Sequence, residues 1–207
     1  MVKSKAPFEP QEHLSYFADV ARGSKVYQGH GWGCAWISDG RWHLYRSVRP
    51  IWEDDLIRFG PTHFLIAHAR SAFRDEGIDV TNNMPFSDGT HVFVFNGELR
   101  GVRIREEGRI GAEKIFNFIR RFDRGDMGAA ILRGVGAIEA RSASVRAMNF
   151  IVADSDRAYV SSRFTDDPEY FTLRMNRNGR RVIVCSEEYP ASAPWTPVRN
   201  GSIEVVR

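Results

Sequence analysis

The order of the periodic segments narrows the folds open to this chain more than any other pattern in it. Alternating apolar residues predict strands in the first half at residues 33–47, with a tight turn at Asp39-Gly40 between two strands, and at residues 63–73 and 91–99. Apolar residues at helical spacing predict helices at residues 7–22, 112–122 and 126–141, and strands return from residue 146 to the end. Strands, a helical middle and further strands indicate an α+β protein in which two mainly antiparallel sheets pack face to face between helices.

Length and charge limit the classes of function. A chain of 207 residues with 43% hydrophobic residues can bury a substantial core, so we expect a single domain over residues 1–207. The net charge of +3 is spread along the chain, which argues against a nucleic-acid partner. The sequence has neither a charged and apolar leader nor an apolar run of membrane-spanning length. These features predict a cytoplasmic protein with no membrane partner.

The two cysteines, Cys34 and Cys185, predict neither a disulfide framework nor a metal site. We therefore expect no metal and no cofactor, and a reducing compartment. Both thiols lie in apolar strand patterns, where a small buried thiol packs well. His30 precedes Cys34 by four residues, but the core interpretation of Cys34 is strongly favoured over a catalytic one.

The stretch HVFVFNGELRG, residues 91–101, alternates like a strand and then reaches Asn96, Gly97 and Glu98. Asn-Gly is a strong turn signal, so a hairpin at the end of the strand is one interpretation. The alternative is that the Asn side chain and the next backbone N–H point at a group that carries negative charge.

Four pieces of sequence, taken in order, resemble the class II glutamine amidotransferases, which are N-terminal nucleophile hydrolases. The pieces are GHGWGCAW, AHARSA, NNMPF followed by FVFNGELRG, and CSEEY near the C-terminus. Their order and spacing cover nearly the whole chain and are more specific than any one of them. The resemblance implies a four-layer αββα sandwich, which agrees with the periodic pattern.

The resemblance also implies roles for particular residues. In this family an N-terminal cysteine attacks the amide of glutamine, and the α-amino group of that cysteine serves as the base. Asn96 and Gly97 would hold the oxyanion, Arg70 would grip the substrate carboxylate, and Ser71 and Trp32 would contribute to substrate binding. Arg70 could instead pair with a surface acid, and Trp32 could be a core aromatic residue or serve in both ways.

Several positions depart from the family pattern. The chain begins Met1-Val2-Lys3, with no cysteine before Cys34, so the thiol nucleophile is absent from the sequence as written. Gly111 stands where the family has an acidic residue that holds the α-amino group of glutamine. Polar family residues are replaced by others, apolar in three of the four cases, at His30, Phe73, Met84 and Phe95. We therefore expect glutamine to bind only in the millimolar range or more weakly, a binding free energy of about 4 kcal/mol.

Two hypotheses follow for a small-molecule amide substrate. The first is an amidohydrolase for glutamine or another γ-glutamyl or acyl amide, with a synthase or ammonia-acceptor subunit as a partner. Its true N-terminus would lie upstream, and residues 2–5 would be the end of a longer first strand. The second is a non-catalytic relative that binds a partner or regulates it. A Met-Cys upstream of Met1 in the genomic sequence would favour the first hypothesis over the second.

Overall fold

The computed structural model describes residues 1–191 and 193–207 of the chain. Its strands form two antiparallel sheets. The larger sheet has the order β11-β9-β10-β1-β4-β2-β3, with β1 (Val2–Phe8), β2 (Trp32–Ser38), β3 (Arg41–Ser47), β4 (Thr62–Ala69), β9 (Arg174–Arg177), β10 (Arg181–Cys185) and β11 (Trp195–Pro197). The smaller sheet has the order β12-β8-β7-β6-β5, with β5 (Phe86–Ser87), β6 (Val92–Arg100), β7 (Ser144–Ala153), β8 (Ala158–Ser162) and β12 (Ser202–Val206).

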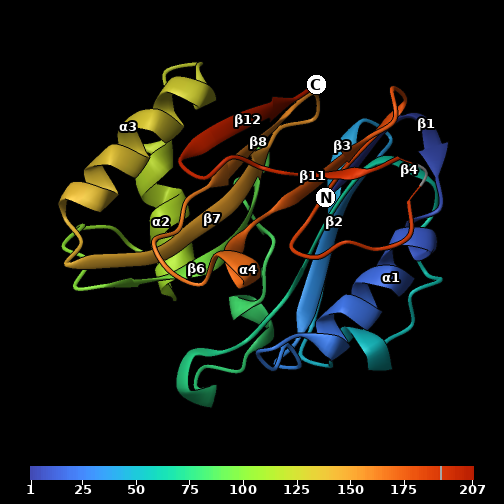
Figure 1. Ribbon diagram of the computed structural model, residues 1–207, viewed down its shortest axis with the longest axis horizontal. Coiled ribbons are helices and arrows are strands. Elements are labelled where there is room, and N and C mark those ends of the chain that lie inside the picture. Colours follow the sequence, from blue (N-terminus) through green and yellow to red (C-terminus); the bar gives the residue numbers. More distant parts are fainter. Residues whose placement is uncertain (192) are drawn as a thin grey trace.

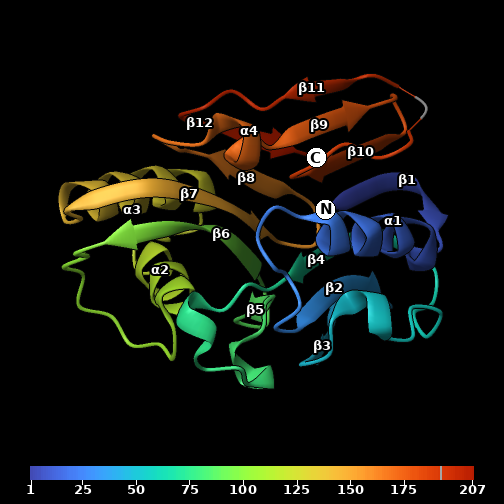
Figure 2. The ribbon, with the colours of Figure 1, turned by 60° about the horizontal axis from the view of Figure 1, so that its bottom comes forward.

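Helices cover the outer faces of both sheets (Figures 1 and 2). Helix α1 (Pro10–Gly23) lies against the larger sheet, and helices α2 (Gly111–Arg120) and α3 (Met127–Ala140) lie against the smaller one. A short helix α4 (Pro168–Phe171) and the 3₁₀ turns Ile51–Glu53, Phe73–Asp75 and Val80–Asn82 lie in the connections. The four-layer αββα sandwich expected from the sequence is confirmed.

Local sequence signals explain several of these elements. Helix α1 begins at Pro10, whose missing N–H costs nothing at the first helical position. Asp39 and Gly40 both have positive φ, 51° and 72°, and form the two-residue turn between β2 and β3. Helix α2 buries Ile115, Phe118 and others along one face, as its periodicity predicts.

The core has two parts. One apolar cluster fills the space between the sheets and continues under α2 and α3, with Phe64, Phe93, Phe116 and Phe150 among its fully buried side chains. The other cluster lies between α1 and the larger sheet and includes Trp32. The inner faces of both sheets are therefore held against each other, and the site described below lies at one end of this contact.

Two expectations of local structure are wrong. Asn96 and Gly97 do not form a turn at the end of a strand, because β6 continues through them to Arg100 and pairs with β7 throughout. A Cβ at Gly97 would lie 2.2 Å from the Ala147 carbonyl oxygen, so close approach to β7 explains the glycine better than a turn does. Tyr170 and Phe171, which fall within the strands expected from residue 146 to the end, lie in helix α4 instead.

Among the described residues, no helix is long and apolar enough to cross a membrane.

Candidate functional site

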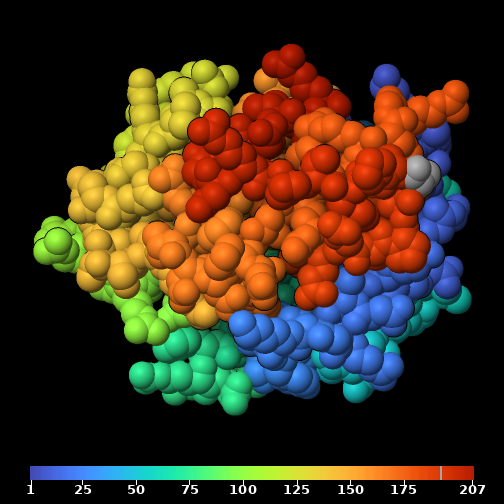
Figure 3. All heavy atoms as spheres, in the orientation of Figure 1, coloured from blue at the N-terminus to red at the C-terminus, as the bar shows by residue number. Residues whose placement is uncertain are grey.

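A cavity of about 1390 Å³ opens at one end of the contact between the two sheets. Its walls come from β1, β4, β6, the start of α2, the loop after β4 and the segment after β10. Arg70, Ser71, Asn96 and Gly97 all line it. Figure 3 shows the surface hollowed where the orange region around α4 meets the blue loop that follows α1.

Two polar contacts join the opposite sides of this opening. Lys25, in the loop after α1, pairs with Asp167 at 2.7 Å. Gln28 Nε2 donates to the Tyr170 hydroxyl at 3.1 Å. The loop after α1 and helix α4 thus hold each other across the mouth of the cavity.

Arg70 is a buried cation at the end of β4, with 6% of its surface exposed. Its Nη1 donates to the Gly77 carbonyl at 2.9 Å and lies 3.5 Å from Asn83 Oδ1. Both partners are neutral, and Arg70 forms no ion pair with any carboxylate among the described residues. Burial lowers the pKa of its guanidinium, while the more distant Asp79 raises it. An anionic ligand would relieve the cost of burying this charge.

Backbone packing sets the direction of the Arg70 side chain. Arg70 N–H donates to the Gly31 carbonyl at 2.9 Å, which extends the pairing of β4 with β2 past the end of the strand. Gly31 has a φ of 105°, and a Cβ there would lie 2.2 Å from Asn83 Nδ2. The glycine therefore leaves room for Asn83, which donates to the Ser47 carbonyl at 2.7 Å and presents its Oδ1 to Arg70. Sequence reasoning assigned no role to Asn83.

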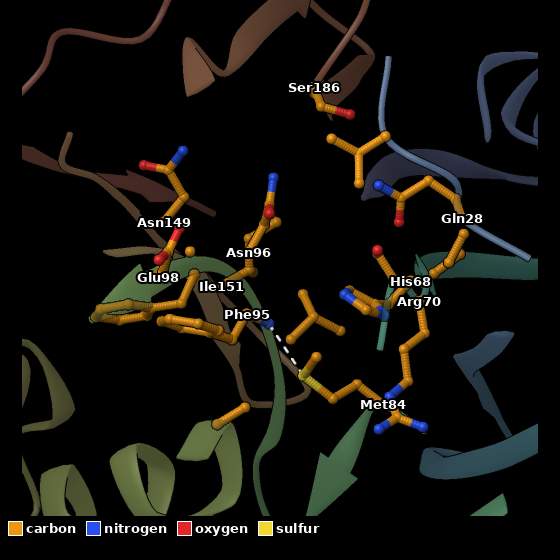
Figure 4. A pocket seen from close by; sticks show the side chains of 18 of the residues that line it. Gln28, His68, Arg70, Met84, Phe95, Asn96, Glu98, Asn149, Ile151 and Ser186 are labelled. Atoms are coloured by element: carbon orange, nitrogen blue, oxygen red, sulfur yellow. Dashed lines mark hydrogen bonds between the residues drawn. The ribbon is translucent and has the colours of Figure 1, made fainter. Parts of the chain in front are cut away.

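Asn96 lies opposite Asn149 on the neighbouring strand β7. Asn149 is fully engaged, since it donates to the Phe171 carbonyl and accepts from the Arg163 N–H. The side-chain amide of Asn96, in contrast, makes no hydrogen bond with the described residues. Figure 4 shows it pointing into the open part of the cavity.

Glu98 follows Asn96 by two residues and so lies on the same face of β6. Across from it, β7 contains a β-bulge, because Glu98 pairs with Ala147 whereas Leu99 pairs with Val145. The extra residue is Arg146, and its guanidinium reaches Glu98 at 3.3 Å. Arg100 also pairs with Glu98 at 2.7 Å, so two arginines neutralise this carboxylate.

His68 lies in the cavity wall between Phe95 and Arg70 (Figure 4). Burial lowers its pKa to about 4; the backbone carbonyl of Phe95 acts in the opposite direction, and the charge of Arg70 lowers the pKa further. Its Nδ1 is buried with no hydrogen-bond partner among the described residues. A buried ring nitrogen without a partner is costly, so His68 is an unusual feature of this wall. The sequence offered the His-x-Arg motif as a signal for this residue, but sequence reasoning assigned it no role.

Apolar side chains separate Arg70 from Asn96. Val94 and Ile151 lie on the same face of the smaller sheet as Asn96, and both line the cavity together with Met84, which Figure 4 places beside Arg70. Met84 Sδ accepts from the Phe95 N–H at 3.2 Å, which fixes the thioether against β6. The two polar ends of the cavity are therefore joined by an apolar middle.

Trp32 does not line the cavity. It is fully buried in the cluster under α1, and its Nε1 donates to Asp54 Oδ2 at 2.9 Å. The Tyr45 hydroxyl donates to the same oxygen at 2.7 Å. Burial raises the pKa of Asp54, but these hydrogen bonds outweigh it and the pKa is lowered overall. This contact network gives Trp32 a clear packing role, and its role in substrate binding stays a prediction.

The two thiols differ in position. Cys34 is buried away from the cavity, and burial raises the pKa of its thiol, which disfavours the reactive thiolate. His30 is engaged elsewhere, because its Nδ1 accepts from the Ala72 N–H at 2.9 Å. Cys185 is half-buried and lines the cavity at the end of β10. The described residues contain no group of His, Cys, Asp and Glu side chains that could hold a metal ion.

The arrangement of layers around this cavity is the fold of the N-terminal nucleophile hydrolases. More specifically, it is the fold of class II glutamine amidotransferase domains, as three solved structures show. One is a glutamine aminotransferase class-II domain protein from Silicibacter pomeroyi, with a TM-score of 0.62 and 18% identity over 84% of this chain and 86% of that one. Another is a predicted glutamine amidotransferase from Pseudomonas aeruginosa, with a TM-score of 0.61 and 14% identity over 99% and 94% of the two chains.

The third structure is the glutamine phosphoribosylpyrophosphate amidotransferase of B. subtilis, with a TM-score of 0.66 and 15% identity over all of this chain. This chain spans only 48% of that enzyme. No protein-family profile matches the sequence, and no curated protein matches it either. At these identities the comparisons show the fold, and they confirm at that level the resemblance drawn from the motifs.

Proposed function

We propose that this chain is a class II glutamine amidotransferase-like domain that binds the amide of a small carboxylic acid and hydrolyses it. One observation carries the proposal: in this fold, a buried guanidinium and a side-chain amide, neither of which has an ion pair or a hydrogen bond to a charged or amide side chain within residues 1–191 and 193–207 beyond the contact of Arg70 with Asn83, line the same cavity. Arg70 would grip the carboxylate of the ligand, since a planar fork of donors suits that group. Asn96 and the Gly97 N–H would hold the amide oxygen where negative charge develops.

Hydrolysis requires a nucleophile at the N-terminal end of β1, as in the family. Strand β1 is antiparallel to β4 with Val2 opposite Leu65, so its N-terminal end runs toward His68 and Arg70. Met1 and Val2 both line the cavity. A thiol presented at this end of β1 would face the ligand, and ammonia released there would pass to a synthase or ammonia-acceptor subunit.

A non-catalytic relative that binds the same amide as a regulatory or partner-binding subunit is the second candidate. The burial of Cys34 favours it, because that thiol is sealed from the cavity and its pKa is raised. Both candidates require the same binding site, and they differ in whether ammonia is released.

Calorimetry with L-glutamine and other amides of small carboxylic acids tests the binding site. We expect at least one amide to bind, and Arg70→Lys and Asn96→Asp to weaken that binding at least tenfold each. Arg70→Lys keeps the charge but loses the fork of donors, and Asn96→Asp keeps the shape but replaces donors by a carboxylate. Failure of every amide to bind, or unchanged affinity in both variants, would refute the proposal.

Ammonia release from the amides that bind separates the two candidates when it is measured on the chain together with any Met-Cys that the genomic sequence places upstream, because the sequence as written carries no thiol at the end of β1. Release that is lost in Asn96→Asp, with the fold intact by circular dichroism, supports hydrolysis. Binding without release supports the non-catalytic relative.

A further inference from the structure

The cavity carries an excess of positive charge. Six arginine and lysine side chains line it, against three carboxylates, those of Glu76, Glu98 and Glu187. Glu98 is already neutralised by Arg100 and Arg146. Glu76 and Glu187 are exposed to solvent at the rim, where their charge is screened. An ammonium group on a ligand therefore finds no free buried carboxylate among the described residues of the wall.

The start of helix α2 lies near the Arg70 end of this cavity. Asp79 is within electrostatic range of both Arg70 and Arg109, which stands just before the helix. Ile110, Gly111 and Ala112 line the cavity, whereas Asp79 does not. A substituent next to the carboxylate that Arg70 binds would thus share this cavity with Gly111 and the start of α2.

That position disfavours a cation. No side chain caps the N-terminus of α2, so its free N–H groups present partial positive charge to the cavity. Lys114, in the first turn, adds a full positive charge and also lines the cavity. The one acid in this turn, Glu113, is turned away and pairs with Arg109 at 2.5 Å.

The middle of the cavity is apolar, because Met84, Val94 and Ile151 line it. Taking these features together, and resting on the function proposed above, we propose that the substrate class is an ω-amide of a carboxylic acid without an α-ammonium group. A monoamide of a dicarboxylic acid has this chemistry. Its carboxylate meets Arg70, its methylene groups pass Met84 and Val94, and its amide reaches Asn96.

Glutaramate and L-glutamine form a matched pair of probes, since they share the carboxylate, the spacer and the amide and differ only in the α-ammonium group. In calorimetry with the full chain, we expect glutaramate to bind at least tenfold more tightly than glutamine. Equal affinities, or tighter binding of glutamine, would overturn the inference and leave the proposed amide site standing. If neither probe binds, the proposed amide site falls and the inference falls with it.

Gly111→Asp supplies the missing carboxylate. A Cβ at Gly111 meets nothing within 4 Å, so the side chain fits, and an acidic residue in the first turn stabilises a helix. We expect this variant to bind glutamine more tightly and to reduce the preference for glutaramate at least tenfold. Gly111→Asn, which has the same shape without the charge, should keep the wild-type preference. An unchanged preference in Gly111→Asp would overturn the placement of the α-substituent beside α2.

Discussion

Mild acid should destabilise this protein through two buried histidines, His13 and His68. His13 lies on the buried face of α1, where its Nδ1 is 2.9 Å from the Tyr189 hydroxyl and its Nε2 is 3.0 Å from Arg181 Nη1. Burial, with the charge of Arg181 next, lowers the pKa of His13 to about 4. Burial likewise lowers the pKa of His68 to about 4. Both imidazoles are therefore neutral in the folded protein down to a pH well below their usual value of 6.5.

The sign of the effect follows from proton binding in the two states. Above pH 6.5 both states hold these rings neutral, and they contribute no pH dependence. As the pH falls from 6.5 toward 4, the unfolded chain takes up protons that the folded protein refuses, so the free energy of unfolding falls. The difference of 6.5 minus 4, at about 1.4 kcal/mol per pKa unit, gives about 3 kcal/mol for each histidine.

Urea denaturation followed by circular dichroism from about pH 7.5 to about pH 4.5 measures this loss. Carboxyl groups whose pKa is lowered by folding, such as those of Asp88 and Glu113, lose their contribution mainly below this window. His13→Asn and His68→Asn should each remove about half of the pH dependence, whatever they do to the stability at neutral pH. His63→Asn is the matched control, because this ring is exposed, and it should keep the wild-type slope.

A free energy of unfolding that is constant across the window would refute the reasoning. The same conclusion would follow if the double variant of His13 and His68 kept the wild-type slope.

Three substitutions test the packing that supports the site. Gly97→Ala should lower the free energy of unfolding by about 1 to 3 kcal/mol, because its Cβ would lie 2.2 Å from the Ala147 carbonyl oxygen. A loss of less than a few tenths of a kcal/mol would contradict the close approach of β6 and β7. Gly136→Ala should raise the free energy of unfolding by about 0.5 to 1 kcal/mol, because Gly136 lies in α3 where a Cβ meets nothing within 4 Å. A lower free energy of unfolding in the same urea assay would count against the helix assignment. Asp54→Asn should lower the free energy of unfolding by about 1 to 3 kcal/mol, because it weakens the hydrogen bonds from Trp32 and Tyr45 to the Asp54 carboxylate. Tryptophan fluorescence that matches wild type throughout a urea titration would show that Trp32 does not depend on this carboxylate.

The sequence alone determined the elements whose signals are local. The spacing of apolar residues in α2 predicted its buried face, and the Asp39-Gly40 pair predicted a tight turn, because helical periodicity and positive φ are properties of short segments. The motifs also predicted that Arg70 and Asn96 belong to one site, and both line one cavity. That prediction rested on the resemblance rather than on the propensities of the two residues.

The tertiary structure decided the features that depend on contacts between distant segments. Asn96-Gly97 has the local preference of a turn, yet pairing with β7 keeps it extended, and only the nearby Ala147 carbonyl shows why glycine stands there. The unpartnered Nδ1 of His68 likewise arises from burial in the cavity wall, which the sequence around His68 does not encode. Local propensities differ by less than the free energy of pairing two strands or burying an imidazole, so long-range packing overrides them wherever the two conflict.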